Sequence, residues 1–176
     1  MKVLQVHNFY RYPGGEDRVC AAERELLSSY GHEVIRYELR NEDVEQLNPA
    51  VAALRTFWNN ATYRDIRKIL HDRRADVVHA HNTFPLVSPS LYYAAHSEHV
   101  PVVQTLHNYR LICPGSTLFR DGKLCEDCVG SPLPLSAVAH GCYRNSRPAS
   151  AVSAGMLSVH RVLNLSLIHI SEPTRP

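Results

Sequence analysis

Short apolar runs alternate with segments of helical periodicity along most of the chain. The apolar runs are rich in branched residues, which predicts β-strands at residues 1–6, 33–37, 76–81 and 102–105. Apolar residues recur at helical spacing in residues 17–30 and 61–73, which predicts two amphipathic helices. The polar, irregular segment 41–60 has room for a short helix at 49–57, and Ser88 as N-cap with Pro89 as first helical residue predicts a helix that ends near His96. Alternating strands and helices indicate an α/β fold, in which helices cover both faces of a parallel sheet.

The first predicted helix, 17–30, carries an apolar stripe that is expected to face the sheet. The stripe consists of Val19, Ala22, Leu26 and Leu27. Gly31 follows the helix and can adopt the left-handed conformation that ends it. Cys20 is expected to be a small core residue, because a free cysteine packs like an apolar side chain.

Polar residues follow the predicted strands at their carboxyl ends, where ligands bind in parallel α/β sheets. A His-Asn pair ends three of the strands: His7-Asn8, His81-Asn82 and His107-Asn108. One such histidine could simply bond a loop carbonyl, but three pairs on one edge of a sheet favour a functional site. We expect the strand order 3-2-1-4, which makes the first and fourth strands neighbours and places Gly15 and His107 within one ligand's reach.

A glycine turn, Pro13-Gly14-Gly15-Glu16, joins the first strand to the first helix. Glycine lets the backbone approach a ligand closely, and the free N–H groups at a helix N-terminus attract anions. A strand, a glycine turn and a helix in this order therefore predict a site for the phosphate of a nucleotide-type ligand.

The composition is that of an ordinary globular domain, with 44% hydrophobic and 20% charged residues. A net charge of +2 is too small to indicate a nucleic-acid partner. No apolar run approaches the roughly 20 residues of a membrane-spanning helix, and the apolar run at the N-terminus is too short for a signal peptide. We therefore expect a cytoplasmic location.

Four of the five cysteines lie in a segment rich in glycine and proline, at about residues 111–145. They are Cys113, Cys125, Cys128 and Cys142, in the spacing C-x11-C-x2-C-x13-C. A C-x2-C pair with two flanking cysteines suits a tetrahedral structural zinc site, which can order a loop that lacks its own core. Unligated thiols, or a disulfide formed under oxidation, are the alternatives. A redox role is disfavoured because the acidic residues between Cys125 and Cys128 would raise the thiol pKa.

The order and spacing of these motifs resemble the N-terminal half of the GT-B glycosyltransferases of retaining family 4. The matching segments are 13–16, 31–34, 76–81 and 101–109, and a subgroup of the family carries a similar cysteine pattern. The resemblance implies the first of two Rossmann-like domains that face each other across a cleft. In the family, the second domain holds most of a nucleoside diphosphate sugar and the first holds the acceptor. The implied activity is sugar transfer to a glycan or lipid-linked acceptor with retention, and it requires no cofactor for catalysis.

Residue by residue, the resemblance assigns Gly14 and Gly15 to the donor diphosphate and His107 to the reacting sugar, as the candidate catalytic residue. The acceptor side would be lined by Asn8, His81, Asn82, Asn108 and Tyr109. Family members that extend lipid-linked glycans often lie on anionic membranes. We therefore expect at most a weak peripheral association with the inner face of the membrane, through the basic face of helix 61–73, because acidic residues interrupt that face.

Two other functions remain open at this point. A nicotinamide-dependent oxidoreductase also begins with a strand, a glycine loop and a helix, but the G-x-G-x-x-G fingerprint is missing after Gly14. Glu38 could replace the acidic residue that binds ribose in that class, although a solvated charge at a strand end is the simpler interpretation. A zinc-stabilised binding module would use the cysteine segment alone.

Residues 165–175 fit no periodic element and resemble the translation of an adapter from transposase-based sequencing libraries. We therefore expect the natural sequence to stop near Asn164, within a longer reading frame. Residues 1–163 would be an incomplete N-terminal GT-B domain with the cysteine-rich insertion at about 111–145, and residues 164–176 a non-native tail. A chain without the second domain is expected to be inactive alone.

Overall fold

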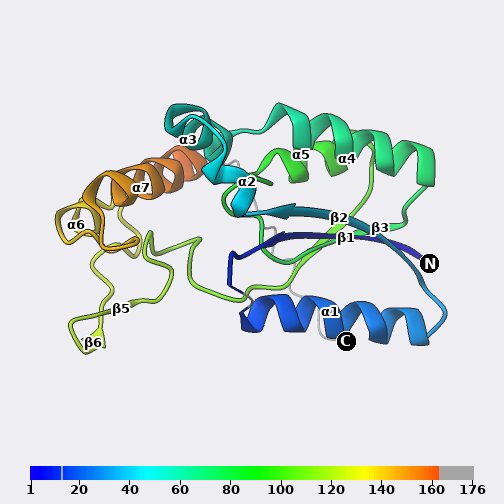
Figure 1. Cartoon of the computed structure of the whole chain (residues 1–176), viewed down its shortest axis with the longest axis horizontal. Coiled ribbons are helices and arrows are strands. Elements are labelled where there is room, and N and C mark those ends of the chain that lie inside the picture. Colours follow the sequence, from blue (N-terminus) through cyan, green and yellow to red (C-terminus); the bar gives the residue numbers. More distant parts are fainter. Residues whose placement is uncertain (13, 163–176) are drawn as a thin grey trace, which may run out of the picture.

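A computed structural model describes residues 1–12 and 14–162. Its centre is a four-stranded parallel sheet in the order β2-β1-β3-β4. The strands are β1 (Lys2–Phe9), β2 (Glu33–Arg40), β3 (Val77–Ala80) and β4 (Val102–Gln104). One face is covered by α1 (Gly15–Ser29), and the other by α4 (Asn60–Arg73) and α5 (Ser90–Ser97) (Figure 1). The predicted Rossmann-like α/β class is confirmed.

The predicted strand order 3-2-1-4 is wrong. β3 pairs with β1 rather than with β2, so it separates the first strand from the fourth. β2 carries exposed charges at Glu33, Arg36 and Arg40, which suit an edge of the described sheet. The apolar residues of β3 are better placed inside the sheet, where they are buried. The strand order therefore reverses between β1 and β3, which is where ligands bind in open parallel sheets.

The apolar core lies between the sheet and the helix pair α4 and α5. Alternate residues of β1 and β3 point to this side, because successive side chains of a strand face opposite ways. The fully buried apolar residues of these strands are Leu4, Val6, Val78 and Ala80. They pack with Ile66, Leu70, Leu91, Ala94 and Ala95 of the two helices. The helical periodicity of residues 61–73 thus predicted the buried face of α4.

The opposite face of the sheet is polar, and this decides which side of α1 is buried. Asp17 and Cys20 are buried, whereas Val19 and Leu26 are 39% and 56% exposed. The expectation that the apolar stripe of α1 faces the sheet is therefore wrong. Buried polar groups need hydrogen-bond partners, and the polar side of α1 supplies them to the side chains of β1 and β3. Cys20 is a buried core residue, as expected.

The remaining described elements lie beyond the carboxyl ends of the strands (Figure 1). α3 (Pro49–Phe57) has the predicted bounds, and it packs against α7 (Arg147–Val162), where Gly155 approaches the ring of Phe57. Three further short elements are α2 (Glu42–Glu45), the hairpin β5 (Phe119–Arg120) and β6 (Lys123–Leu124), and α6 (Leu135–Ala139). The sequence analysis predicted neither α7 nor these short elements.

The expected non-native tail, 164–176, lies outside the described residues. The predicted division into a domain over 1–163 and this tail stays a prediction. Among the described residues, no helix combines the length and the apolar character that crossing a membrane requires.

Candidate functional site

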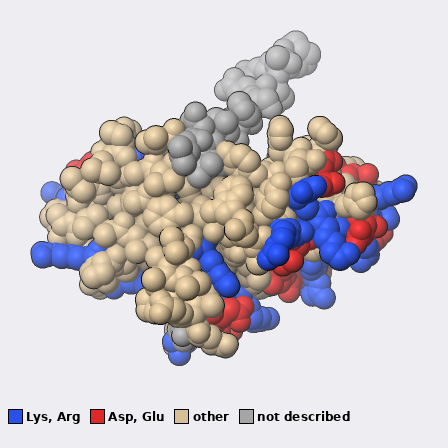
Figure 2. Space-filling model, turned by 90° about the horizontal axis from the view of Figure 1, so that it is seen from above, with Lys and Arg blue, Asp and Glu red and all other residues tan. Residues whose placement is uncertain are grey.

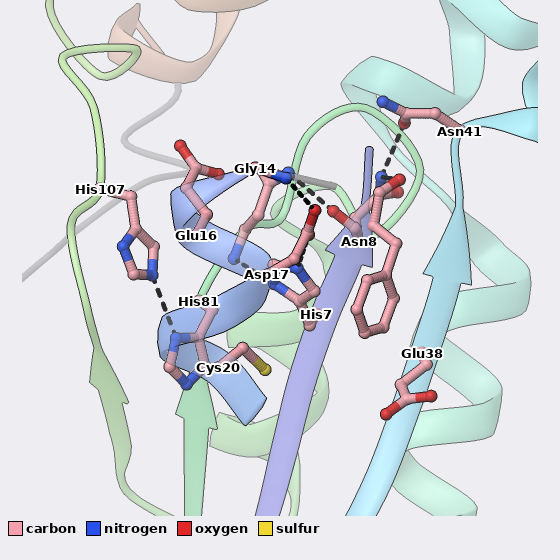
Figure 3. A network of polar contacts seen from close by, with 12 residues as sticks. His7, Asn8, Gly14, Glu16, Asp17, Cys20, Glu38, Asn41, His81 and His107 are labelled. Carbon is pink, nitrogen blue, oxygen red and sulfur yellow. Dashed lines mark hydrogen bonds and ion pairs between the residues drawn. The ribbon is translucent and has the colours of Figure 1, made fainter. Parts of the chain in front are cut away.

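A histidine–aspartate pair fastens β1 to the glycine turn. His7 Nε2 lies 2.6 Å from Asp17 Oδ1, and both side chains are buried. The backbone N–H of Asn82 donates to His7 Nδ1 at 3.4 Å, so the ring proton lies on Nε2 and is donated to Asp17. The other oxygen of Asp17 accepts the N–H of Gly14 at 2.8 Å (Figure 3). Asp17 therefore caps α1 and holds the turn against the sheet.

Two buried asparagines join the ends of β1 and β3. Asn82 Nδ2 donates to the carbonyl of Asn8 at 2.8 Å, and the Asn8 N–H donates to the carbonyl of Asn82 at 2.9 Å. The Asn8 side chain donates to Asn41 Oδ1 at 2.7 Å and accepts the N–H of Leu86 at 3.3 Å. Asn8 thus connects the end of β1 to Asn82, Asn41 and Leu86, at the point where the strand order reverses.

Two further histidines connect β3 to the loop after β4. His81 Nδ1 lies 3.1 Å from His107 Nε2, and the two rings stack (Figure 3). Gln5 Nε2 donates to the carbonyl of Cys20 at 2.9 Å and lies 3.3 Å from His81 Nε2. With Gln5 as the donor, His81 Nε2 is the acceptor and its Nδ1–H is donated to His107. His107 is therefore oriented by the protein itself.

Glu23 approaches His81 and the neighbouring His79 from α1. Its Oε2 lies 3.5 Å from His79 Nε2 and 3.3 Å from His81 Nε2, and the three atoms lie within 4.8 Å of one another. This oxygen is buried and has no hydrogen-bond partner among the described residues. In the part of the chain that the structure describes, these three side chains form the one group already close enough to hold a metal ion.

Burial lowers the pKa of both His79 and His81. It lowers the pKa of His81 from 6.5 to about 3, and the neighbouring His79, His107 and His7 lower it further. Burial also lowers the pKa of His79, although the charge of Glu23 acts in the opposite direction. At neutral pH, His81 is therefore a neutral imidazole, which donates one hydrogen bond and accepts another.

We expect the protein to lose stability as the pH falls below about 6.5. The folded state resists protonation of His81, whereas the unfolded chain takes up that proton near pH 6.5. The unfolded state therefore binds more protons between about pH 6.5 and pH 3, and acid favours it there. In His81→Gln, the Tm should fall less with decreasing pH. The exposed His96→Gln should behave like the parent, and a parent Tm that does not change between about pH 7 and 4.5 would contradict the prediction.

A cavity lies at the carboxyl ends of β3 and β4, beside the N-terminus of α1. Its lining includes His81, Asn82, His107, Asn108, Glu16 and Arg110. Asn108 Nδ2 donates to Glu16 Oε1 at 2.7 Å, which ties the loop after β4 to α1. The loops after the first and fourth strands therefore meet across the end of β3, although the two strands are not neighbours.

The comparisons with known proteins bear on this arrangement. Residues 13–126 match the family model described as Glycosyltransferase Family 4. The chain belongs to glycosyltransferase family 4. The matched range includes the glycine turn, β3, β4 and the loop that carries His107, so most of the cavity lining lies in the matched range. Met156, Leu157 and His160 of α7 complete the lining from outside it. The comparisons with curated proteins and with solved structures yielded no match.

The family 4 domain brings together part of the predicted site. His81, Asn82, His107 and Asn108 line the cavity, whereas Asn8 lies outside it and Tyr109 is 55% exposed. The Gly14 N–H is already bonded to Asp17, and no described atom lies within 4 Å of the place where a Gly15 Cβ would stand. The donor and acceptor roles of these residues stay predictions.

Two charged residues of the cavity, Glu16 and Arg110, had no role predicted from the sequence. Glu16 Oε2 and Arg110 Nε are buried and have no hydrogen-bond partner among the described residues. The Arg110 guanidinium lies 4.1 Å from the ring centroid of Phe84 and 5.1 Å from that of Tyr143. The sequence positions of Glu16 and Arg110 could have marked them as site residues, since Glu16 ends the glycine-turn motif and Arg110 directly follows His107-Asn108-Tyr109.

Proposed function

We propose that this family 4 domain is the acceptor-side half of a retaining glycosyltransferase. The enzyme would transfer a sugar from a nucleoside diphosphate sugar to a glycan or lipid-linked acceptor. The cavity would hold the acceptor and the reacting sugar, with His107 at the sugar. Gly15 would contribute its backbone N–H to the donor diphosphate, because the Gly14 N–H is bonded to Asp17. A second domain would supply most of the donor contacts.

The observation that carries this proposal is the pair of unpartnered polar atoms in the cavity, Glu16 Oε2 and Arg110 Nε. Leaving a buried polar group without a partner costs about 1–3 kcal/mol. A sugar hydroxyl can donate to a carboxylate oxygen and accept from a guanidinium N–H, so a carbohydrate satisfies both. The aromatic rings beside Arg110 add an apolar surface of the kind that small-molecule sites combine with a few polar groups.

The electrostatics of sugar transfer fit the two sides of the proposed site. Breaking the bond between the anomeric carbon and the diphosphate creates positive charge on the sugar and negative charge on the leaving phosphate. A glycine turn at the N-terminus of α1 favours the negative charge, because its N–H groups need no reorganisation. In a retaining front-face transfer, the leaving phosphate accepts the proton of the acceptor hydroxyl, so the protein need not supply a separate base.

The contacts of Glu38 argue against the oxidoreductase alternative. Its carboxylate lies 3.0 Å from Arg24 and 3.8 Å from Arg36, so arginines already neutralise the charge that would have to bind a ribose. The binding-module alternative has no comparable support, because Ser153 and Arg161 of α7 bond the cysteine segment to the rest of the domain.

Ligand-induced stabilisation of the chain tests the proposal. A ligand raises the Tm if it binds only the folded state. We expect UDP, ADP or GDP, or one of their sugar derivatives, to raise the Tm at millimolar concentration, and NAD to leave it unchanged. In Gly15→Ala, the added Cβ meets no described atom within 4 Å, so this variant should fold normally but lose the shift. A shift with NAD alone would overturn the proposal.

The proposed membrane contact is at most weak, because acidic side chains neutralise the basic face of α4. Arg67 and His71 lie 2.8 Å and 3.8 Å from the carboxylate of Glu98, and Lys68 pairs with Asp72. Figure 2 shows basic and acidic side chains interleaved on this side of the molecule.

We therefore expect the chain to co-sediment only weakly with vesicles that contain anionic lipid, and to be released at about 0.5 M salt. Neutral vesicles provide the control. Sedimentation that is indifferent to both anionic lipid and salt would leave α4 as a solvated face. Strong binding that survives high salt would contradict the prediction.

A further inference from the structure

The four cysteines of the insertion meet at one place in the fold. Cys113, Cys125, Cys128 and Cys142 line a single small pocket, and all four are free of disulfide bonds. They come from the loop after β4, from the turn after β6 and from the end of α6. The convergence is therefore a product of tertiary folding and not of local spacing alone.

Two tight backbone features bring the cysteines together. Asp121 and Gly122 have φ angles of 52° and 79°, as in a two-residue turn that reverses the chain between β5 and β6 ahead of Cys125. At Gly115, an added Cβ would lie 3.2 Å from both the Cβ and the carbonyl oxygen of Cys142. Glycine thus permits the close approach of the Cys113 and Cys142 segments.

Hydrophobic burial does not explain why this segment is ordered. From Leu118 to Pro134, the buried residues are Cys128 and Pro134. The apolar side chains of the hairpin point outward, since Phe119 is 60% and Leu124 is 67% exposed. A two-stranded hairpin without an apolar core is marginally stable at best in water. Something other than packing must therefore contribute to its stability.

We propose that Cys113, Cys125, Cys128 and Cys142 bind one structural zinc ion that fastens the hairpin to the end of α6. Four thiolates form a closed tetrahedral site for zinc, and such sites supply folding energy to small segments without a core. Arg120 lines the same pocket and would offset part of the negative charge of such a centre, although its guanidinium also pairs with Asp127 at 2.7 Å.

The four cysteines share one pocket, but their sulfurs do not yet form a tight ligand group. The sulfurs are less tightly grouped than the ligand atoms of Glu23, His79 and His81, so the ion would draw them inward to about 2.3 Å.

The zinc site would also brace one wall of the cavity. Pro114 follows Cys113, and its carbonyl accepts hydrogen bonds from Arg110 at 3.2 Å and from Ser153 at 3.0 Å. Tyr143 follows Cys142, and its ring lies beneath the Arg110 guanidinium. Two of the proposed ligands, Cys113 and Cys142, are therefore each followed directly by a residue that contacts Arg110. This structural role does not depend on the proposed transferase function.

The metal content of the full chain tests the proposal directly. We expect about one zinc ion per chain by elemental analysis, and a mercurial thiol reagent should release it. Cobalt in place of zinc should show sulfur-to-cobalt charge-transfer absorption, which reports thiolate ligands. Cys128→Ser should lower the zinc content at least about tenfold. Cys20→Ser alters the buried cysteine of α1 and should retain full zinc.

Three results would overturn the proposal. One is a parent chain that holds no stoichiometric zinc after purification without chelator and incubation with zinc. Another is full zinc content in Cys128→Ser together with loss of zinc from His79→Gln, which would move the ion to the Glu23 group. The third is a disulfide among the four cysteines under reducing conditions. Because the first measurement uses the unaltered chain, the test remains decisive if a variant fails to fold.

Discussion

Replacing His107 by alanine should lower kcat about 100-fold in the two-domain transferase proposed above. The KM for the donor should change much less. His107 Nε2 lies 3.1 Å from His81 Nδ1, so the protein orients the ring before substrate binds. A preorganised group contributes mainly where charge develops, which is in the transition state rather than in the bound substrate. Steady-state kinetics with separate kcat and KM provide the measurement.

Two variants separate a chemical role of His107 from a structural one. His107→Gln keeps a side chain that can hydrogen-bond to His81 and should recover part of the lost kcat. His96→Ala removes an exposed histidine of α5 and should have the kcat of the parent. An unchanged kcat in His107→Ala would remove His107 from the catalytic role.

Replacing Asp17 by alanine should lower the free energy of unfolding by about 3–5 kcal/mol. Asp17 accepts hydrogen bonds from His7 Nε2 and from the Gly14 N–H, and its side chain is 7% exposed. Its removal leaves a buried donor on His7 without a partner and takes the cap from α1. Urea unfolding of the chain measures this loss.

The control for Asp17→Ala is the exposed Glu25→Ala on the same helix, which should change the free energy of unfolding by less than about 0.5 kcal/mol. Asp17→Asn keeps an acceptor oxygen and should fall between the two. A loss below about 1 kcal/mol in Asp17→Ala would show that the His7 contact is not a stabilising pair.

Features that depend only on residues close together in the sequence were predictable from it. The four strands and α4 followed from apolar periodicity, because each element must bury one face. Gly31 has a φ of 79° and ends α1 as expected. The hairpin turn at Asp121-Gly122 was missed, although Asp-Gly between two short strands is a strong local signal.

The strand order and the buried side of α1 were not predictable in the same way. The order 3-2-1-4 and the order 2-1-3-4 use the same strands, and the choice depends on which strand tolerates an edge. The buried side of α1 depends on Gln5, His7, His79 and His81, which are distant in sequence and face the helix only once β1 and β3 pair. No pattern within α1 contains that information.

The sequence by itself determined the family, the fold class and the His-Asn positions from which the cavity is partly built, because these are encoded in local spacing and in motif order. The tertiary structure decided which of those residues share a cavity and which hold the fold together. His107 lines the cavity, whereas His7 is buried and bonded to Asp17, although both belong to the same His-Asn pattern. The physical reason is that hydrogen-bond partners are chosen by distance in space. Asp17 lies within reach of His7, whereas the cavity beside His107 contains unpartnered atoms of Glu16 and Arg110.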